Sequence, residues 1–266
     1  MIVLPRFARG QALLRKSRVG EVPSNPEDLL LAFALFILVP AFCIELAKPL
    51  GWPPLLVSSF GWALLALGIR GYSAVRYSGQ AFSTSRLSVL QGIRLGVITF
   101  AMWVPFTLLV QSELNKIIPY QHQTLEFLTD STAQSFALNF SIVFFAAAIV
   151  TPFVEELIFR QLIQGWLQKL FSHQYLSGTF SLSTKSNASD SRETHTINWP
   201  AIIVSAGIFA SLHFGQGAAP FALFVLALGI GYVYDRTGSL TACVVVHLLL
   251  NAMTIIFVGM TKFASL

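Results

Sequence analysis

The stretch "FALNFSIVFFAAAIVTPFVEELIFR", residues 136–160, combines a long apolar run with three ionisable side chains close to its end. The run carries no charged residue before Glu155, and a helix needs about 20 apolar residues to cross a bilayer. Ionisable groups at such a position are costly unless they are paired or line a cavity, and they often mark function. The stretch therefore predicts a membrane-spanning helix that carries part of a functional site.

The rest of the chain has the same apolar character. Of its 266 residues, 55% are hydrophobic and only 11% are charged, whereas soluble domains average about 25% charged residues. Apolar stretches recur at approximately 29–49, 54–71, 90–111, 136–158, 200–214, 219–234 and 240–261. The predicted fold class is all-α, a polytopic transmembrane bundle of about seven to eight helices, and no soluble domain is expected.

Basic residues flank the apolar stretches and predict the orientation of the chain. Five arginine and lysine residues precede the first stretch, and Arg70, Arg76 and Arg86 lie around the link between the second and the third. Because cytoplasmic loops are enriched in basic residues, we expect the N-terminus in the cytoplasm and residues 112–135 on the opposite side. The net charge of +5 follows the spans instead of forming one basic patch. The lipid bilayer is therefore the expected partner, and nucleic acid is not.

We divide the chain into two parts. Residues 1–28 are expected to form a basic N-terminal cytoplasmic segment, and residues 29–266 a single transmembrane domain of an integral, multi-pass membrane protein. Within that domain, the polar residues 171–198 predict a cytoplasmic loop rich in serine and threonine. Cys43 and Cys243 fall within apolar stretches and match neither a disulfide framework nor the spacing of metal ligands.

Two of the apolar stretches, 200–214 and 219–234, are short. About 15 residues at 1.5 Å per residue cover roughly 22 Å, less than the ~30 Å of the hydrocarbon core. They are separated by "GQGAAP", residues 215–220. Irregular backbone at that depth is tolerated where it is buried in protein or lines a cavity, so this segment is a candidate wall of a site. The alternative is one helix that continues through the glycines.

The charged residues of the first stretch have a helical spacing. Glu156 and Arg160 are four residues apart, so they share a helical face and can form an ion pair. Glu155 is rotated from Glu156 by about 100°, which leaves its carboxyl group for another role. Pro152 has no N–H group and can kink this helix, which would free a backbone carbonyl near Ala148.

Two histidines lie in later apolar stretches. Phe209 and His213 are four residues apart in "FASLH", and His247 and Asn251 are four apart in "HLLLN". Each pair can share one helical face. Because buried polar groups need partners, we expect both pairs to meet the two carboxylates of the first stretch in one polar cavity. Among these residues, His213 differs most from the others in expected depth.

Together the three patterns form a signature. "EELIFR" at 155–160 fits EExxxR, "FASLH" at 209–213 fits FxxxH and "HLLLN" at 247–251 fits HxxxN, in that order. On these motifs, and on "TGSL" at 237–240, the chain resembles the type II CAAX prenyl protease family of intramembrane peptidases, also called CPBP or Abi. The resemblance covers about residues 135–255, which we expect to form a protease-like core.

The resemblance implies hydrolysis of a peptide bond. This reaction needs a base for water, donors for the oxyanion and a proton for the leaving amine. We expect a catalytic set of Glu155, Glu156, His213, His247 and Asn251, with Arg160 and Phe209 as structural or orienting residues. Glu155 is the candidate base, and His213 is expected to hold the attacking water. His247 and Asn251 are the candidate donors to the oxyanion.

A metal-dependent mechanism is the alternative. Glu155, His213 and His247 would supply a His₂Glu set that leaves one position open for water, as in catalytic zinc sites. The HExxH pattern common in zinc peptidases is absent. The resemblance itself is compatible with both a glutamate-dependent and a metallo-endopeptidase, so zinc stays open as a cofactor.

The expected substrate is a membrane-associated protein or peptide, because the site lies beneath the membrane surface. The resemblance implies CAAX-type C-terminal processing of a prenylated protein as one form of the reaction, although the sequence shows no prenyl pocket. Two other functions stay open. One is a proton- or ion-coupled transporter, in which membrane-embedded carboxylates and histidines carry ions. The other is a non-catalytic membrane protein of the bacteriocin-immunity type.

Overall fold

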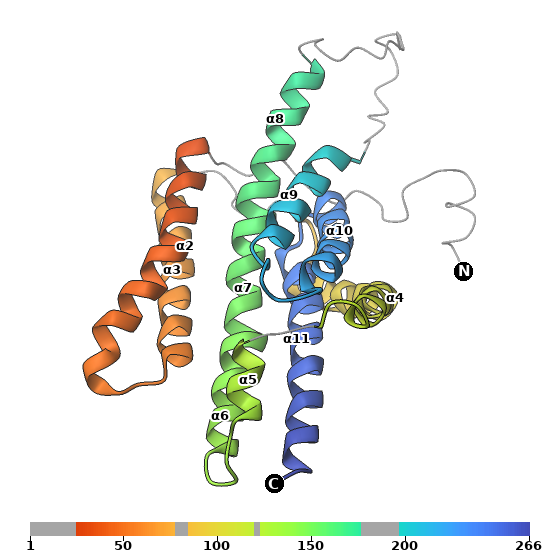
Figure 1. Cartoon of the computed structure of the whole chain (residues 1–266). Helices are drawn as coiled ribbons and strands as arrows, with labels where there is room; N and C mark the ends of the chain where they lie inside the picture. The colour runs from red at the N-terminus through yellow and green to blue at the C-terminus, as the bar shows by residue number, and fades with distance from the viewer. Residues whose placement is uncertain (1–24, 78–84, 120–122, 177–196) are drawn as a thin grey trace.

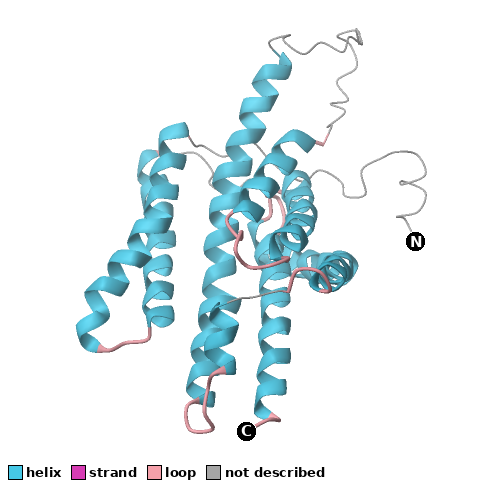
Figure 2. Ribbon diagram, in the orientation of Figure 1, coloured by secondary structure: helices cyan, strands magenta, loops and turns pink. Residues whose placement is uncertain are grey.

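The computed structural model describes residues 25–77, 85–119, 123–176 and 197–266. Most of the predicted N-terminal segment and most of the predicted polar loop therefore lie outside the described residues. What is described is helical, with no β-strand among these residues (Figure 1, Figure 2). The predicted all-α fold class is thereby confirmed.

The helices are of very different lengths. First come α2 (Pro26–Ala47), η1 (Lys48–Leu50), α3 (Pro54–Arg76), α4 (Val89–Asn115) and the short α5 (Gln123–Thr129). One long helical rod follows, built from α6 (Phe136–Val143), η2 (Phe144–Val150), α7 (Thr151–Glu156), η3 (Leu157–Gln164) and α8 (Gly165–Leu176). The described chain ends with α9 (Trp199–Ser211), α10 (Ala219–Thr237) and α11 (Leu240–Phe263).

Six helices of the described residues are long and apolar enough to cross a membrane. They are Pro26–Leu50, Pro54–Arg76, Val89–Asn115, Phe136–Phe171, Ala219–Thr237 and Leu240–Phe263. Six of the seven predicted apolar stretches lie in helices, and the stretch 200–214 extends into the turn after α9, which has only 13 residues and is too short to cross. Helix α10, expected to be short as well, has 19 residues and reaches spanning length.

The link between α9 and α10 is irregular. Helix α9 ends at Ser211 and α10 begins at Ala219, and Gly215 and Gly217 between them have φ values of 96° and 62°. Such values favour glycine because it has no Cβ. In Figure 1 this link lies beside the middle of the rod, away from both of its ends. The alternative of one continuous helix is therefore wrong, and irregular backbone lies at the level of the rod's middle.

Helix α4 crosses the bundle at a steep angle. Figure 1 views α4 almost along its axis, whereas the rod and α11 lie close to the plane of the picture. The Trp103 indole N–H donates to the Val225 carbonyl of α10 at 2.8 Å. Gly229 leaves room for the indole ring, because a Cβ there would lie 2.3 Å from its Nε1 atom. These contacts hold α4 against α10, the helix between the two later motifs.

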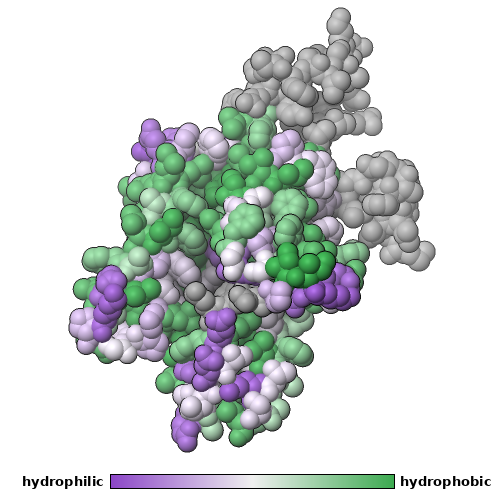
Figure 3. Space-filling view, viewed as in Figure 1, coloured by the Kyte–Doolittle hydropathy of each residue, from purple (hydrophilic) through white to green (hydrophobic). Residues whose placement is uncertain are grey.

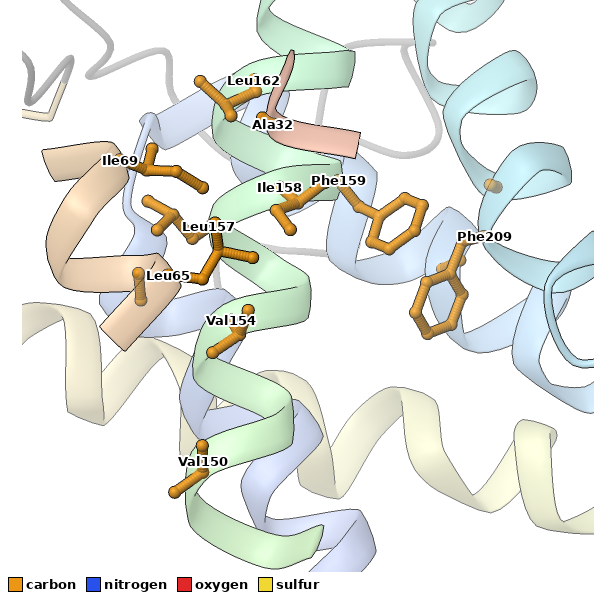
Figure 4. Packing of buried hydrophobic residues seen from close by; sticks show 13 residues of the cluster. Ala32, Leu65, Ile69, Val150, Val154, Leu157, Ile158, Phe159, Leu162 and Phe209 are labelled. Atoms are coloured by element: carbon orange, nitrogen blue, oxygen red, sulfur yellow. The ribbon is translucent and has the colours of Figure 1, made fainter. Parts of the chain in front are cut away.

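The main hydrophobic core surrounds the rod near its middle. Its buried members include Leu65, Ile69, Val150, Val154, Leu157, Ile158, Phe159 and Phe209 (Figure 4). The rings of Phe159 and Phe209 meet edge-on, with 5.0 Å between their centres. This core joins α3, the rod and α9. The polar residues of the rod therefore lie on the faces that do not pack in this core.

Large apolar side chains also cover the outside of the molecule. Exposed examples occur on α2, α3, α4 and α11, among them Leu38, Leu67, Phe106 and Phe257. Apolar residues cover much of the face shown in Figure 3. A soluble monomer rarely exposes so much apolar surface. Together with the six candidate spans, this surface is that of an integral membrane protein, whose outer face contacts lipid.

Candidate active site

The first motif lies in the rod where α7 meets η3, and Glu156 is its centre. This residue is fully buried, and each of its carboxylate oxygens has a different partner. Arg160 donates from Nε to Oε2 at 2.8 Å, so the ion pair expected from the spacing is present. His247 of α11 contacts Oε1 through Nδ1 at 2.9 Å. One carboxylate therefore connects the first motif to the third.

The contact with Glu156 determines where the His247 ring carries its hydrogen. A carboxylate accepts hydrogen bonds, so Nδ1 is the donor. The other ring nitrogen, Nε2, lies 3.7 Å from Oε2 of Glu155. Glu155 is 9% exposed, whereas Glu156 is 0% exposed. The two adjacent carboxylates thus differ in surroundings, because Glu156 is held at both oxygens while Glu155 faces the imidazole across a wider gap.

Phe209 of the second motif packs against residues of the other two motifs. Its ring centre lies 5.6 Å from Cζ of Arg160 and 5.9 Å from the centre of the His247 ring, which it meets edge-on. The two terminal nitrogens of Arg160 have no hydrogen-bond partner in the described part of the chain. The aromatic ring is therefore a contact that offsets burial of the charge. Phe209 holds Arg160 and His247 in position without a polar bond.

His213 lies in the turn after α9, two residues beyond the end of that helix. Its Nδ1 donates to the Phe209 carbonyl at 2.9 Å, and the centres of the two rings are 4.9 Å apart. The two residues of the second motif are thus in contact as expected, but through a turn instead of along one helical face. The side chain is half-buried, and Nε2 is the atom that can serve a water molecule or a substrate.

Asn251 of the third motif bonds to the rod. Its Nδ2 donates to the Ala147 carbonyl at 2.8 Å. Segment η2 is π-helical, and the Thr151 N–H accordingly donates to the Ala146 carbonyl five residues back. In this register the next donor, for the Ala147 carbonyl, would be Pro152, which has no N–H. The freed carbonyl expected near Ala148 is therefore that of Ala147, and Asn251 satisfies it.

The contacts of these side chains bear on the zinc alternative. A zinc ion would need His213, His247 and Glu155 to point at one centre, with one ring nitrogen from each histidine. Within the residues that the structure describes, no group of three or more His, Cys, Asp or Glu side chains is arranged to hold a metal ion. As arranged, these side chains do not fit a His₂Glu zinc site.

Sequence reasoning missed one buried neighbour of the site. Gln164 lies in the rod one turn after Arg160 and is fully buried, and its Nε2 donates to the Gly231 carbonyl of α10 at 2.8 Å. The signal was present in the sequence, because Glu156, Arg160 and Gln164 recur every four residues and so form one polar stripe. The stripe connects the catalytic candidates to α10.

Comparison with known protein families agrees with the motifs. Residues 137–253 match the family described as type II CAAX prenyl endopeptidase Rce1-like. The matched segment contains all three motifs, from Glu155 to Asn251, so the resemblance expected from them is confirmed. Neither a curated protein nor a solved structure matches the chain.

Proposed function

We propose, from the match of residues 137–253 to the type II CAAX prenyl endopeptidase Rce1-like family, that this integral membrane protein is an intramembrane endopeptidase. It hydrolyses a peptide bond in a membrane-associated protein or peptide, with Glu155 as general base. One observation carries the proposal: a buried Glu156 joins Arg160 to His247, and a second carboxylate faces the same imidazole.

The first step of the reaction is attack by water. Glu155 takes a proton from the water molecule while the water oxygen bonds to the carbonyl carbon. This role suits Glu155 because its carboxylate does not belong to the Arg160 pair, which is formed by Glu156. His213, with its Nδ1 engaged by the Phe209 carbonyl, positions the water through Nε2.

The second step is collapse of the tetrahedral intermediate, whose oxyanion needs donors. His247 donates from Nε2 as an imidazolium, because its Nδ1 hydrogen goes to Glu156, and the Glu156 carboxylate stabilises that charge. Asn251 has a second amide hydrogen besides the one that Ala147 accepts. When the C–N bond breaks, the proton on Glu155 passes to the amine nitrogen, which restores the carboxylate.

The substrate class follows from the depth of the site. Glu155 lies well inside the candidate span Phe136–Phe171, so a substrate approaches from within the bilayer or from its edge. A C-terminal CAAX-type tail that a prenyl group anchors to the membrane meets this requirement. The proposal includes one transmembrane domain, residues 29–266, with its protease-like core at about 135–255 and a cytoplasmic N-terminus.

A cleavage assay on the purified protein in detergent tests this function. The substrates are C-terminal peptides, farnesylated and unmodified. We expect the wild type to cleave and Glu155→Gln to lose about 10²- to 10⁴-fold in kcat, the range for loss of a general base. Glu45→Gln is the matched control, because Glu45 is exposed on α2 and pairs with Lys48 at 2.5 Å.

The outcomes separate the alternatives. Cleavage that survives Glu155→Gln would show that another group is the base. Peptides left intact by the wild type would overturn the peptidase function in favour of a transporter or an immunity-type protein. Activity that a chelator removes and zinc restores would favour the metal-dependent mechanism.

A further inference from the structure

A cavity of about 410 Å³ lies beside Asn251, between α4, α5, α10 and α11. Its lining is mostly apolar and includes Leu108, Leu223 and Phe257. Phe257 is 68% exposed and Leu108 is 39% exposed, so the cavity opens sideways, toward the lipid. Asn251 lines the cavity and follows His247 by one helical turn, so the cavity lies next to the proposed catalytic centre.

Thr107 and Gln111 of α4 line this cavity, and each carries a buried polar atom without a partner among the described residues. Thr107 is only 3% exposed, and its hydroxyl has no hydrogen-bond partner among the described residues. The buried Nε2 atom of Gln111 has none there either. Thr254 lines the same cavity, but its hydroxyl donates to the Leu250 carbonyl at 3.0 Å, as threonines in helices often do. The Thr107 hydroxyl and the Gln111 amide thus have hydrogen-bonding capacity beside the cavity that the described residues do not use.

The spacing of the two groups matches that of an extended peptide. Thr107 and Gln111 are four residues apart on one helix, so they lie on one face and about 6 Å apart along its axis. Along an extended chain, carbonyl groups that point to the same side recur every two residues, at about 6.6–6.8 Å. The two side chains can therefore donate to two successive same-side carbonyls of one chain.

We propose that this cavity binds an extended, apolar segment of the substrate polypeptide, with Thr107 and Gln111 donating to its main chain. The inference rests on the proposed peptidase function and names the subsite that holds the chain next to the scissile bond. A lipid or isoprenoid chain fits the apolar wall but offers no acceptor to either side chain. The unpaired donors therefore favour a peptide.

Binding without cleavage tests the subsite. The parent is full-length Glu155→Gln, and the probe is an unmodified peptide with aliphatic side chains, followed by fluorescence anisotropy. Thr107→Val, which removes the hydroxyl and keeps the shape, and Gln111→Leu should each raise Kd about three- to tenfold, the effect of one lost hydrogen bond. Thr107→Ser keeps the hydroxyl and should bind like the parent. Thr261→Val is the control, since Thr261 is exposed on α11 and bonds to Val258.

Modified peptides identify the atoms involved. A peptide with one carbonyl oxygen replaced by sulfur accepts hydrogen bonds poorly there. At the position that Thr107 contacts, this replacement should weaken binding to the parent. Thr107→Val has no hydroxyl there, so it should bind the modified and the unmodified peptide equally well. Melting temperatures close to that of the parent show that the variants are folded.

Two results would overturn the subsite. One is an unchanged Kd in both Thr107→Val and Gln111→Leu. The other is an effect seen only with farnesylated peptides, which would make the cavity a site for the isoprenoid. Cleavage by the wild type separates the two proposals. If the wild type cleaves and Kd is unchanged in the variants, only the proposed subsite is wrong. If the wild type cleaves no peptide, the proposed function is wrong.

Discussion

Glu155 and Glu156 are neighbours with identical side chains, and their surroundings give them different importance for folding. Glu156 is the counter-charge of Arg160, which is itself 0% exposed, and it also holds His247. A buried charge that loses its partner is strongly destabilising. Within the described part of the chain, Glu155 has only the more distant contact with His247, so its importance lies in the proposed chemistry.

We therefore expect the same substitution to change stability at one position and not at the other. Glu156→Gln should lower the free energy of unfolding by about 3–5 kcal/mol, because it leaves the Arg160 guanidinium without its counter-charge. Glu155→Gln should unfold close to the wild-type temperature, although we expect it to lose most of its activity. Thermal unfolding in detergent measures both, and Glu113→Gln, which removes a surface pair with Lys116, should match the wild type. Equal melting temperatures for the two motif variants would contradict this division.

The sequence predicted part of this geometry. A spacing of four residues predicted the contact between Glu156 and Arg160, because it fixes two side chains on one helical face. The bond between His247 and Glu156 joins positions 91 residues apart, and spacing within a helix contains no information on how two helices are rotated toward each other. The resemblance implied an orienting role for Phe209, but its contacts with Arg160 and His247 could not be predicted for the same reason.

At the scale of the helices, the rod deviates from α-helical geometry on both sides of the two glutamates of the first motif. Its π-helical segments η2 and η3 lie on either side of α7, and π-helical turns are often found at functional sites. Pro152 is the sequence signal for the first deviation, and the sequence predicted a freed carbonyl within one residue of the observed one. The π register itself follows from tertiary contacts, among them the bond from Asn251 to Ala147, and could not be predicted from propensity.

The pairing of Asn251 with a proline-freed carbonyl predicts a dependence between two substitutions. Asn251→Leu should cost about 1–2 kcal/mol, because the Ala147 carbonyl then has no donor inside the bundle. In a Pro152→Ala background the new N–H can donate to that carbonyl, so the same change should cost less. A double-mutant cycle on unfolding free energies measures the difference.

Additive costs in that cycle would argue against the coupling between Asn251 and the carbonyl that Pro152 leaves free. Turnover gives an independent readout of its proposed donation to the oxyanion. If Asn251 donates to the oxyanion, the Pro152→Ala, Asn251→Leu double variant should keep a low kcat even where its stability returns toward that of Pro152→Ala alone.

For the molecule as a whole, hydropathy predicted where helices occur but not how they are inclined. Apolar length sets whether a helix can cross, whereas tilt is set by packing against neighbouring helices. Helix α4 owes its steep crossing to contacts such as Trp103 against Gly229, which no pattern along one helix encodes. The short α9 was the partial exception, because its length and the following glycines predicted irregular backbone near the site.

The ends of the rod allow the predicted orientation to be tested. In Figure 1 the start of α2 lies at one end, and the link from α5 to α6 lies with the C-terminus at the other. Basic residues gather near the start of α2, which predicts that this end is cytoplasmic. In a parent without Cys43 and Cys243, Glu27→Cys should react with a membrane-impermeant maleimide only after cells are opened. Ala133→Cys should react in intact cells, and the reverse pattern would place the N-terminus outside.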